Sequence, residues 1–355
     1  MSSLRSDMEK SSNTIKVLQV GDFPPPAGGV ATHVEELFKA VRKSGGDSQV
    51  LDIGKGQLPA DGVHGAGSMP AFAAYLTGKA ARGFRIHLHT NGANPKSWLL
   101  AQACAAAGRL SGGAMITLHS GLGPAWLSAS PARQKAARAV LSQYRNVIAV
   151  SGQIRDALAG CGVNDAVVLP AFSPASVKPG DAPRGFVRTD GDLLFCAMIA
   201  PRPEYGQGIL LEAFAAVRAQ LPHARLALYG PGSENVRAEG VQSFGELQRP
   251  QALALMAACD VFVRPTLADG DSVSVREAIA LGRIVVATDV GSRPPETRLV
   301  EAGHVASLAT GLISAASELS ARPVRSEEPL AADPFSRILA LYGFTEDRCA
   351  ASAVS

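Results

Sequence analysis

The sequence is poor in cysteine, and its cysteines follow no pattern. The five residues, an odd number, are scattered and never form a C-x-x-C pair. Structural zinc sites and disulfide frameworks need cysteines at close and repeated spacings. The sequence therefore predicts neither kind of site, and it favours a reducing, cytoplasmic location.

Long apolar runs and a strong net charge are also missing. No run of eighteen apolar residues is present to span a bilayer. Residues 1–14 lack the apolar segment of a secretory signal and are predicted to be a disordered tail. A net charge of +3 and an aromatic content of 5% give no basis for a nucleic-acid partner. A mild basic cluster over residues 133–145 is better explained as a solvated helix face than as a contact with an anionic membrane.

A chain of 355 residues is too long for one ordinary core and suits two α/β domains. Short β-branched runs alternate with helical patterns, which is typical of parallel sheets with crossover helices. We expect strands at residues 15–20, 49–53, 85–89, 114–118, 146–150 and 167–169, and then at 193–199, 225–229, 261–264 and 284–288.

The pattern loosens between residues 173 and 190, where proline, glycine and serine occur without a period, as in an interdomain linker. This places one Rossmann-like domain at 15–172 and a second at 191–325. Residues 326–355 are expected to form a C-terminal helix and tail, with a return to the first domain as one alternative. A ligand site is expected in the cleft between two such domains, at the carboxyl ends of the strands.

Two glycines, Gly28 and Gly29, precede a predicted helix whose capping-box residues Thr32 and Glu35 place its start near Thr32. Glycines before a helix N-terminus suit a phosphate or sugar oxygens, although a plain strand-to-helix turn explains them equally well. The G-x-G-x-x-G fingerprint is absent after the first strand, which disfavours a nicotinamide enzyme.

The most informative segment is RPTLADGDSVSVREAIALGRIVVATDVGS, residues 264–292. A strand ends near Arg264, a loop carries Asp269, and a helix from about residue 274 carries Glu277 among apolar neighbours. A carboxylate inside such a helix needs a partner if it is buried, and the hydroxyls of a bound ribose would satisfy it. A surface position for Glu277 is the alternative.

This segment resembles the E-x7-E region of family-4 glycosyltransferases, the glycogen-synthase-like group 1, with Asp269 on the first Glu and Glu277 on the second. Other blocks line up in the same order. GGVATHVEEL resembles the acceptor-side glycine loop, and LHS at 118–120 resembles the active-site histidine position. MIAPRPEYGQGILLEAF resembles the G-R-x-x-x-x-K-G phosphate element, and LYGPGSE the turn beside the nucleotide. The likeness covers about residues 15–300, and ordered blocks are more specific than any single motif.

The resemblance implies the GT-B fold: α/β, two Rossmann-like domains with parallel sheets facing each other across a cleft. It implies a retaining transfer from a nucleoside-diphosphate sugar, with UDP or GDP favoured over ADP, and no metal or other cofactor. The acceptor would be a glycan or lipid-linked molecule of cell-surface polysaccharide or glycoconjugate biosynthesis. Peripheral contact with the cytoplasmic membrane face is an alternative that the family leaves open.

The resemblance also assigns roles to residues. Glu277 would hold the ribose hydroxyls, Arg202 would neutralise the diphosphate leaving group, and His119 would contact the donor sugar. Asp269 would bind the transferred sugar and its phosphate with four backbone amides, those of Gly270, Asp271, Ser272 and Val273. The remaining donor-binding positions are Gly28, Gly29, Gln207 and Gly230.

Two departures from the family pattern bear on activity. Asp269 is one methylene shorter than the usual Glu, and Gln207 stands where the family has a Lys, which removes a cation from the leaving group. Arg264 or Arg276 is a candidate substitute for that cation. A catalytically silent binding or scaffold subunit, and a GT-B-like epimerase or phosphorylase, are therefore the alternative hypotheses.

Two further histidines, His87 and His89, lie on one face of a predicted strand. A metal site would need a third ligand, and the neighbouring sequence offers none. The spacing therefore favours cleft-lining hydrogen-bond donors over metal ligands, and no metal site is predicted.

Overall fold

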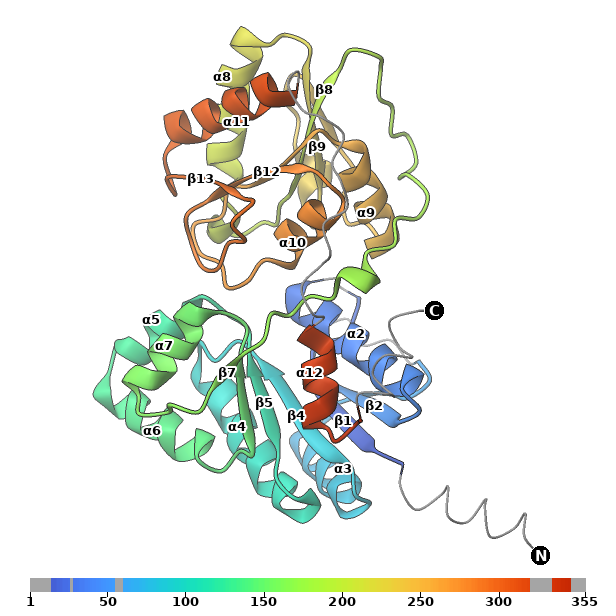
Figure 1. Ribbon diagram of the computed structural model, residues 1–355, viewed down its shortest axis with the longest axis vertical. Coiled ribbons are helices and arrows are strands. Elements are labelled where there is room, and N and C mark those ends of the chain that lie inside the picture. Colours follow the sequence, from blue (N-terminus) through green and yellow to red (C-terminus); the bar gives the residue numbers. More distant parts are fainter. Residues whose placement is uncertain (1–13, 26–27, 55–59, 320–333, 346–355) are drawn as a thin grey trace, which may run out of the picture. The chain divides into compact units, whose positions relative to one another are not determined.

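The computed structural model describes residues 14–25, 28–54, 60–319 and 334–345 (Figure 1). The chain divides into two compact units, residues 1–173 with 332–355, and residues 174–331. The predicted tail at 1–14 lies almost wholly outside the described residues, as does much of the predicted C-terminal segment. The segment predicted as a linker, 173–190, belongs almost entirely to the second unit.

Unit 1 contains a parallel sheet of seven strands in the order β3-β2-β1-β4-β5-β6-β7. The strands are β1 (Lys16–Gly21), β2 (Asp47–Asp52), β3 (Val63–Gly65), β4 (Arg85–Thr90), β5 (Met115–Leu118), β6 (Asn146–Ala149) and β7 (Val167–Val168). The α-helices are α2 (Gly29–Lys43), α3 (Met69–Ala81), α4 (Pro95–Gly108), α5 (Leu122–Ser128), α6 (Pro131–Leu141), α7 (Gly152–Gly160) and α12 (Pro334–Leu341).

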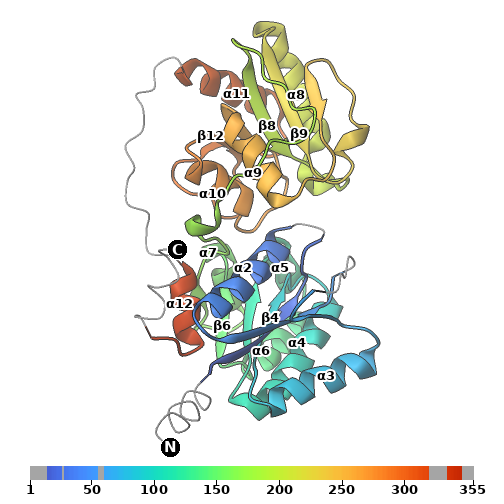
Figure 2. The ribbon, with the colours of Figure 1, turned by 90° about the vertical axis from the view of Figure 1, so that its right-hand side faces the viewer.

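Helices α2 and α12 lie side by side on one face of this sheet (Figures 1 and 2). Helix α2 packs on the sheet through an apolar stripe, in which Val34, Leu37 and Val41 are fully buried. Leu37 and Val41 share a core with Val17 of β1 and with Ile338 of α12. A helix from the end of the chain therefore completes the core of the first unit.

Unit 2 contains a parallel sheet of six strands in the order β10-β9-β8-β11-β12-β13. The strands are β8 (Leu193–Met198), β9 (Ala224–Tyr229), β10 (Val241–Ser243), β11 (Val261–Arg264), β12 (Ile284–Thr288) and β13 (Arg298–Val300). The α-helices are α8 (Gln207–Gln220), α9 (Arg249–Ala258), α10 (Val273–Ala280) and α11 (Val305–Leu319).

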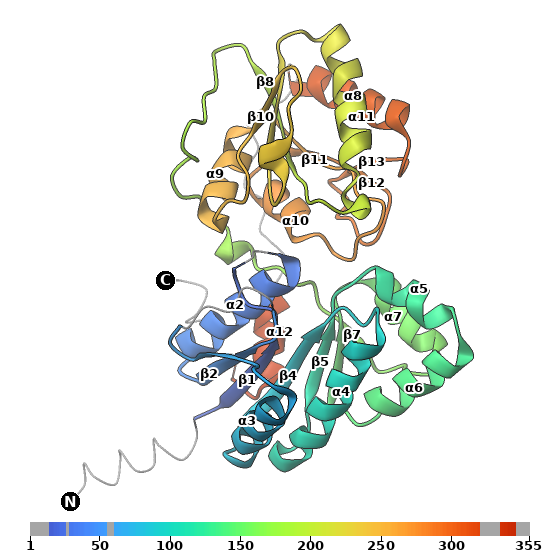
Figure 3. The ribbon, with the colours of Figure 1, turned by 180° about the vertical axis from the view of Figure 1, so that it is seen from behind.

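Successive residues of the unit 2 strands enter two different cores, because side chains alternate across a sheet. Phe195 packs with α8 and α11, whereas its neighbour Cys196 packs with α9 and α10. Figure 3 shows these two helix pairs on opposite faces of the sheet. Burial on both faces explains the nearly continuous apolar runs of these strands.

Two local predictions were wrong. Helix α2 begins at Gly29, because the Thr32 N–H donates to Gly28 O at 2.8 Å, and Thr32 is a buried residue of the first turn instead of a cap. The short strands β3, β10 and β13 were not predicted, since three residues give too little alternation to be recognised. Among the described residues, the helices are all too short or too polar to cross a membrane.

Candidate active site

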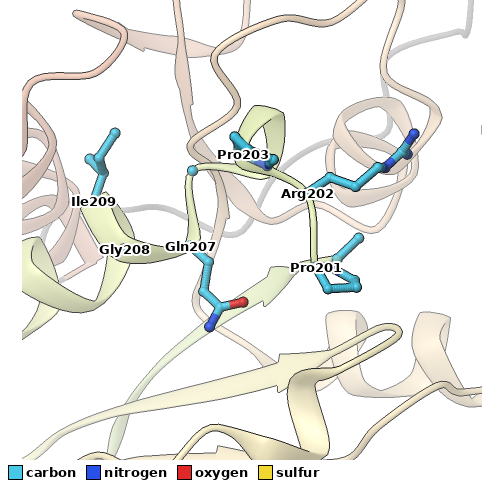
Figure 4. A pocket seen from close by; sticks show the side chains of 8 residues that line it. Pro201, Arg202, Pro203, Gln207, Gly208 and Ile209 are labelled. Atoms are coloured by element: carbon cyan, nitrogen blue, oxygen red, sulfur yellow. The ribbon is translucent and has the colours of Figure 1, made fainter.

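Loops at the carboxyl ends of the unit 2 strands gather most of the predicted site residues. A pocket of about 310 Å³ is lined by the loop after β8 and the start of α8, including Arg202 and Gln207. Figure 4 shows the Arg202 and Gln207 side chains leaving this segment in different directions. Gln207 is the first residue of α8, so the helix N-terminus, which attracts anions, opens on this pocket.

Tyr205 connects Arg202 to the next strand. The Arg202 guanidinium lies 5.1 Å from the centre of the Tyr205 ring and donates to its hydroxyl at 3.2 Å. The guanidinium of Arg264, at the end of β11, lies 5.0 Å from the same ring centre. Arg202 is exposed whereas Arg264 is buried, so an exposed and a buried cation share one aromatic ring.

Asp269 lies between two arginines. Its Oδ2 accepts from Arg264 Nε at 3.1 Å and from Arg293 Nη2 at 3.2 Å, and its Oδ1 accepts from the Gly270 N–H at 3.1 Å. Burial acts to raise the pKa of Asp269, but the two arginine charges and these hydrogen bonds outweigh it and hold the pKa below its usual value. Two guanidinium charges against one carboxylate leave this cluster with a surplus positive charge.

Two glycines allow close packing of the backbone in the loops of this site. Gly291 has φ +69°, and a Cβ there would lie 2.6 Å from Asp269 O. Gly230 has φ +106° at the end of β9, and a Cβ there would clash with Ile199 O. The predicted donor-binding Gly230 is thus required by the turn itself.

The loop that follows Asp269 leads into α10. Asp271 accepts from Arg276 Nε at 2.7 Å, and burial outweighs this cation and raises the pKa of Asp271. Ser272 caps α10 without a side-chain hydrogen bond to its backbone, and Val273 is the first helical residue. The amides of this loop therefore meet the helix N-terminus.

Glu277 is buried on α10, with 7% of its surface exposed, and the alternative of a surface position was wrong. Its Oε1 accepts from Arg249 Nε at 2.9 Å, and Arg249 also donates to Ser176 Oγ at 2.8 Å. The sequence identified the need for a partner but not Arg249, which lies on another helix. The carboxylate of Glu277 is therefore held in an ion pair inside the unit.

The remaining predicted residues lie in unit 1. Gly28 is the N-cap of α2, and Gly29 is its first residue. His119 follows β5 directly, is half-buried, and its backbone N–H donates to Thr90 O at 2.9 Å. Burial lowers the pKa of His119 to about 3. The imidazole is therefore neutral at physiological pH.

His119 belongs to a buried histidine cluster that the sequence did not reveal. Its Nε2 lies 3.4 Å from Nδ1 of His33, on α2, and 3.3 Å from Nδ1 of His89, on β4. The prediction that His87 and His89 line a cleft was wrong, because they are 0% and 1% exposed and are hydrogen-bonded within the unit. The third member of the cluster, His33, lies on helix α2, far from His89 and His119 in the sequence.

Three functional candidates were thus missed: Arg249, Arg293 and His33. Arg293 directly follows the informative segment 264–292, and this position was the available signal. Of the two substitutes considered for the missing lysine, Arg276 is paired with Asp271, and Arg264 shares Asp269 with Arg293.

Both halves of the chain match models of sugar-transferring families. Residues 27–172 match the model of glycosyltransferase family 4, and residues 190–318 match that of glycosyl transferases group 1. None of the curated proteins matches the sequence significantly.

Several solved structures have a similar fold. A HepE protein of Anabaena, in complex with UDP and glucose, is 18% identical with a TM-score of 0.67, covering 95% of this chain and 97% of that chain. A sucrose-phosphate synthase of Thermosynechococcus elongatus is also 18% identical, with a TM-score of 0.63 and coverage of 95% and 93%. A putative UDP-N-acetylglucosamine 2-epimerase of Listeria monocytogenes is 15% identical, with a TM-score of 0.55 and coverage of 87% and 89%. At these identities the likeness shows the fold alone.

Proposed function

Because the chain belongs to the family-4, group 1 glycosyltransferases, we propose that it transfers a sugar, with retention of configuration, from a nucleoside-diphosphate sugar to a glycan or lipid-linked acceptor. UDP is the proposed nucleotide, since a structure of the same fold was solved with UDP and glucose. We further propose that this transfer serves cell-surface polysaccharide or glycoconjugate synthesis in the cytoplasm. The buried, free state of the four described cysteines is compatible with a reducing compartment.

The observation that carries the proposal is the surplus of positive charge beside the loop that holds Asp269. Arg264 and Arg293 carry two charges against one carboxylate. The exposed Arg202 adds a third charge, because it lies against Tyr205, which Arg264 also contacts. A departing diphosphate needs this charge, because preorganised cations stabilise the negative charge that develops as the sugar–phosphate bond breaks.

This arrangement also offers a substitute for the missing lysine. Gln207 carries no charge, and the chain contains no lysine after Lys178. Arg202 and the Arg264–Arg293 pair therefore supply the cations for the leaving group. Guanidinium groups suit this task, since they remain protonated and bind phosphate oxygens in a bidentate manner.

Each remaining site residue has a proposed role. Glu277, with its partner Arg249, binds the ribose hydroxyls, and Asp269 with the amides that follow it binds the donor sugar. His119 donates to or accepts from a sugar hydroxyl as a neutral imidazole. The sugar–diphosphate bond breaks, the acceptor oxygen bonds to the anomeric carbon from the same face, and the acceptor proton passes to the departing phosphate oxygen.

A screen of the purified protein against UDP-, GDP- and ADP-sugars tests the proposal. A ligand that binds only the native state stabilises it by mass action and so raises the melting temperature. At a ligand concentration of 100 Kd the stabilisation is about 2.7 kcal/mol. We expect one UDP-sugar to stabilise the protein. We also expect the protein to hydrolyse that donor slowly to free sugar, or to transfer its sugar slowly. Stabilisation without any turnover would favour a silent binding subunit, and product formed from the donor alone by isomerisation would favour an epimerase.

A further inference from the structure

The histidine cluster of unit 1 has the dimensions of a metal site. The ligand nitrogens of His33, His89 and His119 all lie within 4.8 Å of one another. Two of the three separations, from His119 Nε2 to the Nδ1 atoms of the others, are 3.4 and 3.3 Å. A tetrahedral zinc ion at about 2.0–2.1 Å from each nitrogen holds its ligands about 3.3–3.4 Å apart. Two edges of the triangle therefore already fit the ion.

The side chain of Gln19 fixes which nitrogen of His89 carries the proton. The Oε1 of Gln19 lies 2.8 Å from His89 Nε2, and an amide oxygen can only accept, so the proton of His89 is on Nε2. The Nε2 of Gln19 donates in turn to the Tyr342 hydroxyl at 3.1 Å, which orients the amide. His89 Nδ1 therefore presents a lone pair towards His119, as a metal ligand must.

The three facing nitrogens of the neutral cluster share at most one proton. Because His89 Nδ1 carries no proton, His119 Nε2 either donates to its neighbours or accepts from His33 Nδ1. In each arrangement a single proton lies among three facing nitrogens, so at most one of the two short approaches is a full two-centre hydrogen bond. A single cation would bind all three lone pairs together.

We propose that His33, His89 and His119 form a binding site for a transition-metal dication, of which Zn²⁺ is the best fit. Three imidazoles suit zinc, copper and nickel, whereas magnesium and calcium require oxygen ligands. His119 is half-buried, whereas His33 and His89 are buried. The inference does not rest on the proposed sugar transfer, but the site includes His119, so an ion bound to Nε2 would keep that nitrogen from the donor sugar.

Metal binding is tested on the full-length, untagged protein after dialysis against a chelator. We expect isothermal titration with Zn²⁺ to give one ion per chain, and Co²⁺ to produce the intense visible bands of four-coordinate geometry. His119→Ala should weaken zinc binding by about 100-fold or more, and Gln19→Leu by the roughly 10- to 100-fold typical of lost outer-shell partners. His119 is the least buried of the three ligands, which makes this variant the one best suited to stay folded.

Three exposed histidines provide the control. His64, His223 and His304 are exposed and lie outside the cluster, so their combined replacement by alanine should leave zinc affinity unchanged. The proposal is overturned if wild-type protein binds no zinc, if the weak spectrum of six-coordinate Co²⁺ appears, or if the His119→Ala variant binds as tightly as wild type. Since none of these readouts uses sugar transfer, an inactive enzyme would leave the outcome unaffected.

Discussion

The carboxylate of Glu277 on α10 accepts a hydrogen bond at 2.9 Å from Nε of Arg249, the first residue of α9. Both side chains are largely buried: 9% of the Glu277 side-chain surface and 17% of the Arg249 side-chain surface are exposed. Glu277 therefore has two roles: it is the residue proposed to bind ribose, and it links α10 to α9. Substitutions at Glu277 must therefore be read for stability and for binding separately.

We expect Glu277→Ala to lower the free energy of unfolding by about 3–5 kcal/mol, since it removes the carboxylate beside a buried guanidinium. Glu277→Gln keeps the shape and should cost less. Urea denaturation measures both. If the alanine variant were as stable as wild type, the ion pair would have no structural role.

The Glu277→Gln variant also tests the ribose contact. With the fold retained, we expect it to lose most of the stabilisation that the UDP-sugar gives, because a charged acceptor is replaced by an amide. Wild-type affinity for the donor in a folded Glu277→Gln protein would contradict the proposed role.

Arg202→Ala should reduce kcat/KM without affecting the fold. Arg202 is exposed, so its loss should change stability by no more than about 0.5 kcal/mol. A lost hydrogen bond to a charged phosphate is worth about 1.5–3 kcal/mol, or roughly 10- to 150-fold in kcat/KM. Arg184→Ala, another exposed arginine of unit 2, is the matched control and should transfer sugar normally.

Gln207→Lys should restore the family's cation at the pocket. We expect donor turnover to rise about tenfold, the equivalent of 1.4 kcal/mol of added leaving-group stabilisation. The lysine stands at the N-terminus of α8, where a cation costs about 0.3–1 kcal/mol of stability. Gln220→Lys, at the other end of the same helix, should leave turnover unchanged. No gain from Gln207→Lys would show that the arginines already supply all the charge that the reaction uses.

The stability of unit 2 should fall in acid because of Asp269. Its pKa is lowered in the folded protein, so its contribution to stability is fully present above the unfolded pKa and is lost as the pH falls through the folded pKa. We expect Asp269→Asn to be less stable than wild type at pH 7, with the difference shrinking as the pH falls below about 4. Thermal unfolding measured across that range gives both curves, and parallel curves would contradict the prediction.

Gly291→Ala should be among the most damaging glycine substitutions. The new Cβ would lie 2.4 Å from Gly270 O, in addition to the strain of φ +69°. Gly282 has a similar φ of +74° with no atom within 4 Å of the added Cβ, so Gly282→Ala isolates the backbone term. We expect the control to cost about 1–2 kcal/mol and Gly291→Ala clearly more, measured by urea denaturation. Equal losses of stability in the two variants would show that the loop carrying Asp269 and Gly270 moves away from the added Cβ without a free-energy cost.

Much of the fold was readable from the sequence. The strands at 261–264 and 284–288 were predicted at the bounds that the structure gives, because both are dense in valine and other strand-forming residues. The start of α2 was missed, since the Thr32–Glu35 spacing of a capping box also occurs inside a helix. The three-residue edge strands have too little pattern to detect.

By itself, the sequence determined the two α/β units, the order of the family motifs, and the need of Glu277 for a partner. Only the tertiary structure decided which partners meet: Arg249 with Glu277, Arg293 with Asp269, and His33 with His89 and His119. The physical reason is the same in each case. Periodicity and turn chemistry act over a few neighbouring residues, whereas these contacts join residues 24 to 86 positions apart and exist only once the helices and loops have assembled around their sheets.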